Sequence, residues 1–441
     1  MRLQRQSLNT LIDWAQDSQR KPLLLRGARQ VGKSYLVEQL AKQSFQSWLP
    51  INFELEPQYK ACFQTLDPHE ICNAIAAISH QPITAGETLL FLDEIQDCPQ
   101  AIQALRYFKE KMPTLHVIAA GSLLELILNQ ADFRMPVGRV SFQYLYPLSF
   151  KEFLLNANPE VLPYIEQATI KKPMSEAIHN HLLKSLRTYM LTGGLPEACA
   201  HYIDNKNLQK LQAIQASIIA TYENDFGHYH HIVAAQYLRS CFNKSPLLVG
   251  QQIKYNKINS ELRSRELKQA ISALEDANIL QRICATSATG LPLNATVNEK
   301  KFKLNFIDIG LVKRFNQLDA SLLLENDIVL LNNGALAEQF VGQELLVYAD
   351  SYEKTKLYFW ARDGSGAAEV DYLTVVDDKI LPIEVKAGKI GKLKSLKQYL
   401  LEHQAPFGIR VSQLPLHKEE NILTIPLYML SELKRLCREN F

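Results

Sequence analysis

The sequence predicts an α/β protein that begins with a parallel β-sheet covered by helices. Apolar runs at residues 22–26, 88–94 and 115–122 have the length and composition of buried strands. Helical spacing separates them, as at residues 34–43, and a glycine-rich loop joins the first strand to this helix. Buried strands that alternate with helices are typical of a parallel sheet with helices on both faces.

The composition is that of a multidomain globular chain. At roughly 150 residues per domain, 441 residues suggest about three domains. Apolar residues make up 47% and charged residues 21%, which excludes global disorder. The net charge of +2 shows no overall basic excess, so any nucleic-acid binding has to come from local patches.

The seven cysteines form no CxxC pair, which argues against a disulfide framework or a zinc ribbon and for a reducing compartment. The sequence shows no apolar signal core and no apolar run of about 20 residues. We therefore expect a cytoplasmic protein without a membrane partner.

The loop at residues 27–34, GARQVGKS, carries the clearest chemistry because it fits GxxxxGK followed by Ser or Thr. Glycines let the backbone N–H groups surround phosphates, and the helix N-terminus adds the positive end of a dipole. Lys33 is expected to neutralise the β- and γ-phosphates, and Ser34 to hold Mg²⁺. The predicted nucleotide-binding residues are Gly27, Ala28, Arg29, Gln30, Val31, Gly32, Lys33, Ser34 and Tyr35.

Further catalytic candidates follow the next two predicted strands. Asp93 is expected to bind the metal through water, and Glu94 to polarise the attacking water. Ser122 is expected to sense the γ-phosphate, with a helix N-cap as an equally good alternative. Arg139 is the candidate cation for transition-state charge, in cis or from a neighbouring subunit, and Arg134 is its rival.

Five motifs occur in order along the chain: RGARQVGKS, LLFLDEIQ, AAGSLL, GRV…YPLSFKEF and GGLPE. Together with KLNFIDIGLV at residues 303–312, they resemble the bacterial and archaeal AAA+-type ATPases that carry a C-terminal region of unknown function, the DUF4143 family. The resemblance covers nearly the whole chain and implies ATP as the nucleotide. The chain also contains no Asn-Lys-x-Asp guanine reader. Only Arg187 is a candidate for a second sensor arginine, so a homo-oligomer is left open.

We divide the chain into four predicted regions. Residues 1–148 form the P-loop ATPase core, and residues 149–225 form a helical lid that is interrupted by a Gly-Gly-x-Pro turn. Residues 226–320 are predicted to be a winged-helix-like domain, with its recognition helix at residues 264–275. Residues 321–441 return to mixed α/β structure.

Charged residues of the last region suggest a second site. Asp371 lies in one predicted strand, while Glu384 and Lys386 alternate in the next and share a face. With Glu338 on the preceding helix, the order resembles the PD-(D/E)xK nuclease fold of archaeal Holliday-junction resolvases. The resemblance implies Mg²⁺ held by Asp371 and Glu384, with Glu338 completing the shell and Lys386 activating water. The alternative is a structural ion cluster without cleavage. Glu369 is expected on the opposite face and is left out.

Basic residues in two places are candidates for DNA contact. Arg263, Arg265 and Lys268, at and just before the predicted recognition helix, could meet phosphates or base edges, with a structural spacer as the alternative reading of this segment. A second stretch has no acidic residue and suits a phosphate backbone, with a solvated helix face as the alternative. It contains Lys386, Lys389, Lys392, Lys394 and Lys397.

We therefore expect an ATP- and Mg²⁺-dependent protein that couples ATP turnover to binding or processing linear or branched DNA, including Mg²⁺-dependent cleavage. One alternative is an ATP-dependent switch or scaffold whose nuclease-like domain does not cleave and binds DNA or a protein. Another is an NTPase directed solely at proteins.

Overall fold

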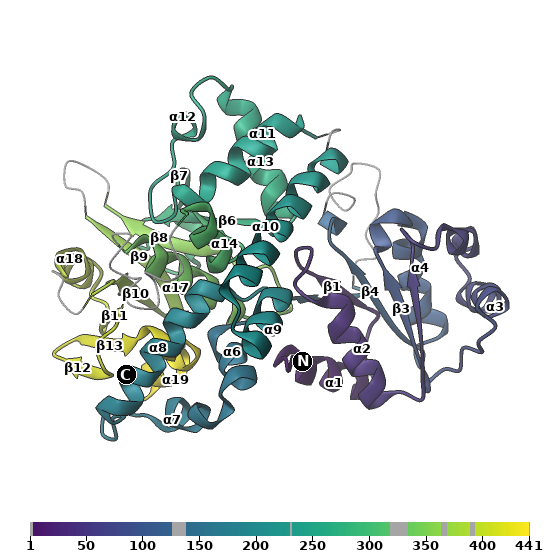
Figure 1. Ribbon diagram of the computed structural model, residues 1–441, viewed down its shortest axis with the longest axis horizontal. Helices are drawn as coiled ribbons and strands as arrows, with labels where there is room; N and C mark the ends of the chain where they lie inside the picture. The colour runs from purple at the N-terminus through teal and green to yellow at the C-terminus, as the bar shows by residue number, and fades with distance from the viewer. Residues whose placement is uncertain are drawn as a thin grey trace.

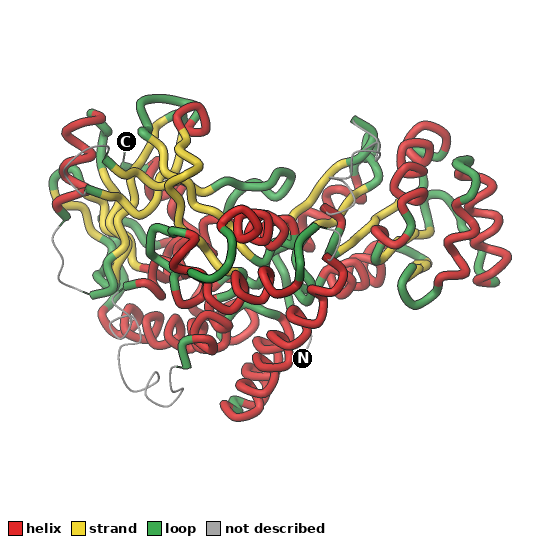
Figure 2. Tube along the Cα trace, turned by 90° about the horizontal axis from the view of Figure 1, so that it is seen from above, coloured by secondary structure: helices red, strands yellow, loops and turns green. Residues whose placement is uncertain are grey.

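The computed structural model describes residues 3–125, 138–229, 232–317, 334–362, 368–388 and 393–440. Two β-sheets lie at opposite ends of the molecule, and helices from the middle of the chain lie between them (Figures 1 and 2). None of the helices in these ranges is long and apolar enough to cross a membrane.

The N-terminal sheet has five parallel strands in the order β2-β3-β4-β1-β5. The three strands predicted from apolar runs are confirmed as β1, β3 and β4. The other two were not predicted: Pro50 interrupts β2, which lies at the sheet edge where proline is tolerated, and β5 is short and half polar. The strands are β1 (Leu23–Arg26), β2 (Ser47–Asn52), β3 (Thr88–Asp93), β4 (His116–Gly121) and β5 (Ser141–Tyr144).

Helices cover both faces of this sheet because successive residues of each buried strand point to opposite sides. Leu25 and Phe91 belong to the core on the side of α1 and α2, whereas Leu24 and Leu90 belong to the core on the side of α3 and α4. The elements are α1 (Ser7–Gln16), α2 (Lys33–Ser44), α3 (Pro68–Ser79), α4 (Pro99–Lys111), η1 (Pro57–Phe63) and η2 (Ile95–Asp97).

The predicted helical region follows the first sheet. A capping box of Ser149 and Glu152 begins its first helix, and the predicted turn ends α8 at Gly193. The helices of this region are α6 (Phe150–Ala157), η3 (Pro159–Val161), α7 (Leu162–Gln167), α8 (Glu176–Thr192), α9 (Pro196–Asn205) and α10 (Leu208–Asp225). In Figure 1, α6, α9 and α10 lie between the two sheets.

Three helices and an antiparallel hairpin come next, and the predicted helix at residues 264–275 corresponds to α13. The elements are η4 (Phe226–Tyr229), α11 (Ala235–Lys244), η5 (Ser245–Leu247), α12 (Tyr255–Ile258), α13 (Ser264–Asp276), β6 (Leu280–Thr286), η6 (Leu293–Thr296), β7 (Val297–Phe306) and α14 (Ile309–Phe315).

The hairpin does not stand alone. It joins the strands of the C-terminal region in one eight-stranded sheet of order β12-β13-β11-β10-β9-β8-β6-β7, because β6 pairs in parallel with β8. The predicted division at residue 320 therefore does not separate two sheets. The remaining elements are α17 (Ala335–Val347), β8 (Leu357–Ala361), β9 (Glu369–Val376), β10 (Lys379–Val385), α18 (Lys394–His403), β11 (Gly408–Ser412), β12 (His417–Glu419), β13 (Ile422–Pro426), η7 (Leu427–Glu432) and α19 (Leu433–Arg438).

Candidate functional site

The loop between β1 and α2 needs glycine at both ends. Gly27 and Gly32 have φ values of 149° and 91°, in a region that favours glycine. A Cβ atom on Gly27 would collide with the backbone carbonyl of Leu145. The loop leads directly into α2, which begins at Lys33, so its backbone N–H groups and the helix N-terminus share one edge of the sheet.

Lys33 is buried inside the loop. Its Nζ donates hydrogen bonds to the carbonyls of Gly27 at 3.0 Å and Ala28 at 2.9 Å. Burial lowers the pKa of Lys33 to about 8, against the opposing effect of the Glu94 and Asp93 carboxylates. The side chain is thus held where the loop would surround phosphates.

The predicted metal residues meet across the ends of two elements. Ser34 Oγ donates a hydrogen bond to Asp93 Oδ2 at 2.7 Å. Burial raises the pKa of Asp93, while the hydrogen bond from Ser34 opposes this shift. A hydroxyl and a carboxylate are ligands that suit Mg²⁺, so both residues fit this ion beside the phosphate loop.

Glu94 follows Asp93 in a left-handed conformation, with φ of 48°. Its Oε2 accepts hydrogen bonds from Gln96 Nε2 at 2.7 Å and from Ser122 Oγ at 3.3 Å. The structure thus brings Ser122, at the end of β4, to Glu94. We did not single out Gln96, although it lies in the LLFLDEIQ motif. Gly121 makes room for it, because a Cβ there would collide with Gln96 Oε1.

The predicted loop residues Arg29 and Tyr35 contact other parts of the chain. Arg29 Nη1 pairs with Asp225 Oδ1 at 2.6 Å, and its carbonyl accepts a hydrogen bond from Tyr222 at 2.7 Å. The hydrogen bond that Arg29 donates to the Asp225 carboxylate is the main cause that raises the pKa of Arg29. Tyr35 donates to the carbonyl of Leu3 at 3.3 Å. Helix α10 therefore touches the phosphate loop directly.

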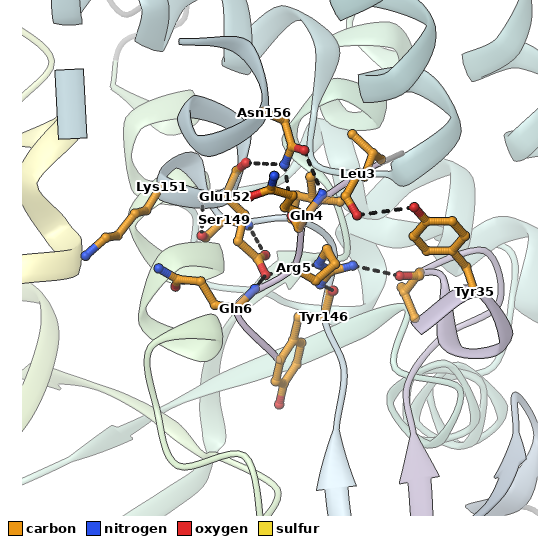
Figure 3. A network of polar contacts seen from close by, with 12 residues as sticks. Leu3, Gln4, Arg5, Gln6, Tyr35, Tyr146, Ser149, Lys151, Glu152 and Asn156 are labelled. Atoms are coloured by element: carbon orange, nitrogen blue, oxygen red, sulfur yellow. Dashed lines mark hydrogen bonds and ion pairs between the residues drawn. The ribbon is translucent and has the colours of Figure 1, made fainter. Parts of the chain in front are cut away.

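A buried arginine that we did not predict ties the N-terminal segment to the loop (Figure 3). Arg5 donates to the carbonyl of Val31 at 3.0 Å and to that of Tyr146 at 2.8 Å. It also pairs with Glu152 at 3.0 Å, in the capping box of α6. These contacts link the loop, the end of β5 and the first helix of the helical region.

Of the two arginine candidates, the structure describes Arg139 and does not bring it to the loop. Arg139 precedes β5 at the amino end of the parallel strands, whereas the loop follows their carboxyl end, and it pairs with Glu110 at 2.9 Å. This placement does not support a role of Arg139 in cis. Arg134 lies outside the described residues.

Two sequence motifs, the GGLPE turn and the KLNFIDIGLV segment that contains Asp308, contact each other. Gly194 N donates to Asp308 Oδ2 at 2.6 Å, so the GGLPE turn lies against the start of α14. A Cβ on Gly193 would collide with the Asp308 carboxylate, and burial raises the pKa of Asp308 to about 6. Pro196 packs close to Gly32 on the other side of the turn. The turn therefore contacts both the phosphate loop and the C-terminal half.

The C-terminal candidates lie on neighbouring elements, as predicted. Asp371 on β9 accepts a hydrogen bond from Val385 N at 2.7 Å, and Lys386 pairs with Glu384 at 2.5 Å. Glu384 Oε2 is buried and has no hydrogen-bond partner. Burial is the largest cause that raises the pKa of Glu384 to about 7 and of Glu338 to about 8.

Our placement of Glu369 was wrong. It pairs with the same ammonium group, that of Lys303, as do Glu338 and Asp371. Residues two apart in a strand share a face, so Glu369 lies on the face of Asp371. Within the described ranges, no group of three His, Cys, Asp or Glu residues could hold a metal ion. The predicted set of Glu338, Asp371 and Glu384 is therefore not a preformed metal site.

The basic candidates lie at the surface where they can be described. Arg263, Arg265 and Lys268 are exposed around α13, and Lys394 and Lys397 are exposed on α18. The predicted Lys389 and Lys392 lie outside the described residues.

Three family models match parts of the chain. Residues 19–154 match the AAA domain model. The match supports an AAA-type P-loop ATPase. Residues 183–322 and 333–429 match two domains of unknown function, DUF8612 and DUF4143. The predicted resemblance is confirmed to this extent, and the strand order around the P-loop is that of a parallel-sheet α/β ATPase domain.

Solved structures show distant likeness only. The chain is 11% identical to PCH-2 of C. elegans, over 47% of this chain and 65% of that chain, with a TM-score of 0.29. It is 12% identical to the Thermotoga maritima RuvB Holliday junction branch migration motor, over 64% of this chain and 90% of that chain, with a TM-score of 0.29. It is 14% identical to the Drosophila ORC bound to DNA, over 71% of this chain and 85% of that chain, with a TM-score of 0.25. The comparison with curated proteins gives no match.

Proposed function

We propose that the chain is an ATP-hydrolysing switch whose ATPase domain controls a DNA-binding C-terminal half. The observation that carries this proposal is the hydrogen bond from Ser34 to Asp93, beside Lys33 and Glu94. It supports the proposal because a hydroxyl and a carboxylate, ligands that suit Mg²⁺, lie next to a phosphate-binding loop. Mg²⁺ would supply charge neutralisation at the β- and γ-phosphates.

The chain's own groups would divide the work of hydrolysis. Lys33 would bind the phosphates, and Glu94 would orient and deprotonate a water molecule for attack on the γ-phosphate. Gln96 and Ser122 hold the Glu94 carboxylate through hydrogen bonds. We propose that Ser122 exchanges this contact for one to the γ-phosphate. The GGLPE turn and the Arg29–Asp225 pair would then transmit loop movements to the helices.

The test of the ATPase site compares two variants with the wild type. Lys33→Ala should abolish ATP turnover without unfolding the protein. Glu94→Gln should retain ATP and lower turnover by at least about a hundredfold, because the general base is lost. Turnover is measured by phosphate release and binding by a fluorescent ATP analogue. Full turnover in Lys33→Ala would refute the assignment, and unchanged turnover in Glu94→Gln would move the base elsewhere.

DNA is the partner that we propose for the C-terminal half. Three helices followed by a hairpin resemble a winged helix, and Arg263, Arg265 and Lys268 are exposed around α13. DNA should therefore stimulate ATP turnover, and the effect should decline steeply as salt rises. Lys268→Ala should weaken it, while Lys171→Ala, at an exposed position before α8, serves as the control. A salt-independent response, or none, would favour a protein partner instead.

A second candidate function is Mg²⁺-dependent DNA cleavage by a nuclease-like C-terminal domain. It is favoured by the placement of Asp371 and Glu384 on neighbouring strands, with Lys386 directly after the second strand. Linear, single-stranded and four-way-branched DNA, with Mg²⁺ or Mn²⁺ and with or without ATP, would reveal it. Cuts that are lost in Lys386→Ala would establish a nuclease. A cytoplasmic location, and a homo-oligomer in which Arg139 acts between subunits, remain predictions.

A further inference from the structure

Lys303 is a buried cation among carboxylates of the C-terminal half. It is 1% exposed, and its Nζ lies 3.2 Å from Glu338 Oε2 and 3.6 Å from Asp371 Oδ1. It also pairs with Glu369, and it lies 5.3 Å from the centre of the Phe359 ring. One ammonium group thus joins acidic residues of α17 and β9.

This lysine comes from a different part of the chain than the carboxylates. It lies on β7, in the segment matched by DUF8612, whereas its partners lie in the segment matched by DUF4143. Two further residues of the same part of the chain contact the carboxylates. Gln252 donates to Glu369 Oε2 at 2.7 Å, and Gly250 lies against the Glu338 carboxylate. The region before residue 317 therefore closes over the acidic residues.

The charge balance explains why Lys303 is tolerated at this position. A buried ammonium costs several kcal/mol unless carboxylates compensate it. Here burial favours the neutral amine, but the three carboxylates outweigh it and raise the pKa of Lys303. The lysine therefore keeps its charge at neutral pH.

A divalent metal would need the same oxygens. Mg²⁺ requires carboxylate oxygens at about 2.1 Å in octahedral geometry. A second cation placed among these oxygens would also repel the Lys303 ammonium, and this repulsion is strong where little water screens it. The three carboxylates that contact Lys303, those of Glu338, Glu369 and Asp371, therefore accommodate one cation of either kind.

We propose that Lys303 is the built-in cation of this cluster, where it takes the place of a divalent metal, and that the C-terminal half is consequently a metal-independent module that does not cleave DNA. The proposal decides against cleavage as the second candidate function. It does not rest on ATP hydrolysis, so either can fail without the other.

The unpaired oxygen of Glu384, Oε2, suggests how the site would change if Lys303 lost its charge. This buried atom has no hydrogen-bond partner, and the carboxylate of Glu384 interacts electrostatically with Asp371 and Lys303. In Lys303→Met the apolar stem is kept and the charge is lost. The freed carboxylates and Glu384 should then take up a divalent cation.

The experiment measures Mn²⁺ binding to the full-length chain by electron paramagnetic resonance without nucleotide. Every sample carries Asp93→Asn, so that the phosphate loop contributes no metal site. Lys303→Met is expected to bind one Mn²⁺ at least about tenfold more tightly than its parent, because a competing charge has been removed. Lys300→Met, an exposed position on the same strand, should match the parent. Adding Glu384→Gln to Lys303→Met should abolish the gain.

Two results would overturn the proposal. One is Mn²⁺ binding by the parent that depends on Glu384 and is as tight as in Lys303→Met. The other is a folded Lys303→Met protein, verified by circular dichroism, that gains no Mn²⁺ site. If Lys303→Met folds only with Mn²⁺ present, the rise in melting temperature upon adding Mn²⁺ replaces the titration, and it too must disappear with Glu384→Gln.

Discussion

Lys33 combines burial with a function that requires positive charge. Its pKa of about 8 means that the ammonium form is complete below pH 7 and is lost above pH 9. Bound phosphates favour the charged form, so binding above pH 8 has to take up a proton. The association constant for ATP should be flat below pH 8 and fall by up to about tenfold per unit above it. Calorimetric titrations between about pH 7 and 9.5 measure this slope.

The control for this dependence is Lys33→Arg. Its guanidinium stays charged over the whole range, so any binding that survives should lack the slope. A slope that persists in Lys33→Arg would assign the proton to another group.

Single residues differed in how well the sequence predicted them. The loop residues were predictable because they are contiguous and their roles follow from the backbone path. Arg5, Asp225 and Lys303 were not, because their partners lie far away in the sequence, as with Arg5 and Glu152. For Arg139, only the role in cis loses support: its motif position suggested catalysis, but the parallel sheet places it at the other end of the strands from the loop.

Helix α17 is the element that joins the two halves. It is buried on nearly all sides, and its polar residues reach in several directions. Gln339 exchanges hydrogen bonds with the backbone of Phe306, and Gln343 donates to Tyr189. Both oxygens of Glu344 accept from the backbone N–H of Phe150, at 3.0 and 3.2 Å. The sequence predicted this helix but not these partners, because they depend on tertiary packing.

Glu344 provides a test of this junction. Burial raises its pKa to about 8, so its ionisation costs stability progressively as the pH rises from about 4.5 to 8. Glu344→Gln keeps one acceptor for Phe150 without the charge and should be at least as stable as the wild type at pH 9. Glu344→Ala should lose about 1–3 kcal/mol at pH 6, because the Phe150 N–H is left unpaired. Urea unfolding at both pH values measures the differences.

The pH dependence also distinguishes a protonated Glu344 from one whose negative charge stabilises the junction. If Glu344→Gln loses as much stability as Glu344→Ala at pH 9, the carboxylate charge itself stabilises the junction, and the raised pKa is refuted.

At the scale of the whole molecule, the C-terminal sheet is expected to behave as one body. The parallel ladder between β6 and β8 joins Ile283 to Leu357 and Thr286 to Trp360. Amides of β6 and β8 should therefore exchange with deuterium at similar rates in the full-length protein. ATP should change protection in α9 and α10, which contact the phosphate loop, more than within this sheet. Hydrogen exchange with mass spectrometry measures both.

Much faster exchange in β6 than in β8 would show that the hairpin opens independently of the C-terminal strands. The sequence did not predict their union, because parallel pairing between distant strands leaves no local signal. Only the apolar runs of the separate strands were visible.

The shared sheet also has a consequence for how such chains are inherited. The two models that end at residue 322 and begin at residue 333 each describe only part of this sheet. A recombination event that replaced one segment alone would leave β6 or β8 with an unpaired edge, and unpaired strand edges promote aggregation. It would also separate Lys303 from its carboxylates. We therefore expect the two segments to occur together in related chains. Residues that contact each other across the two segments should change together.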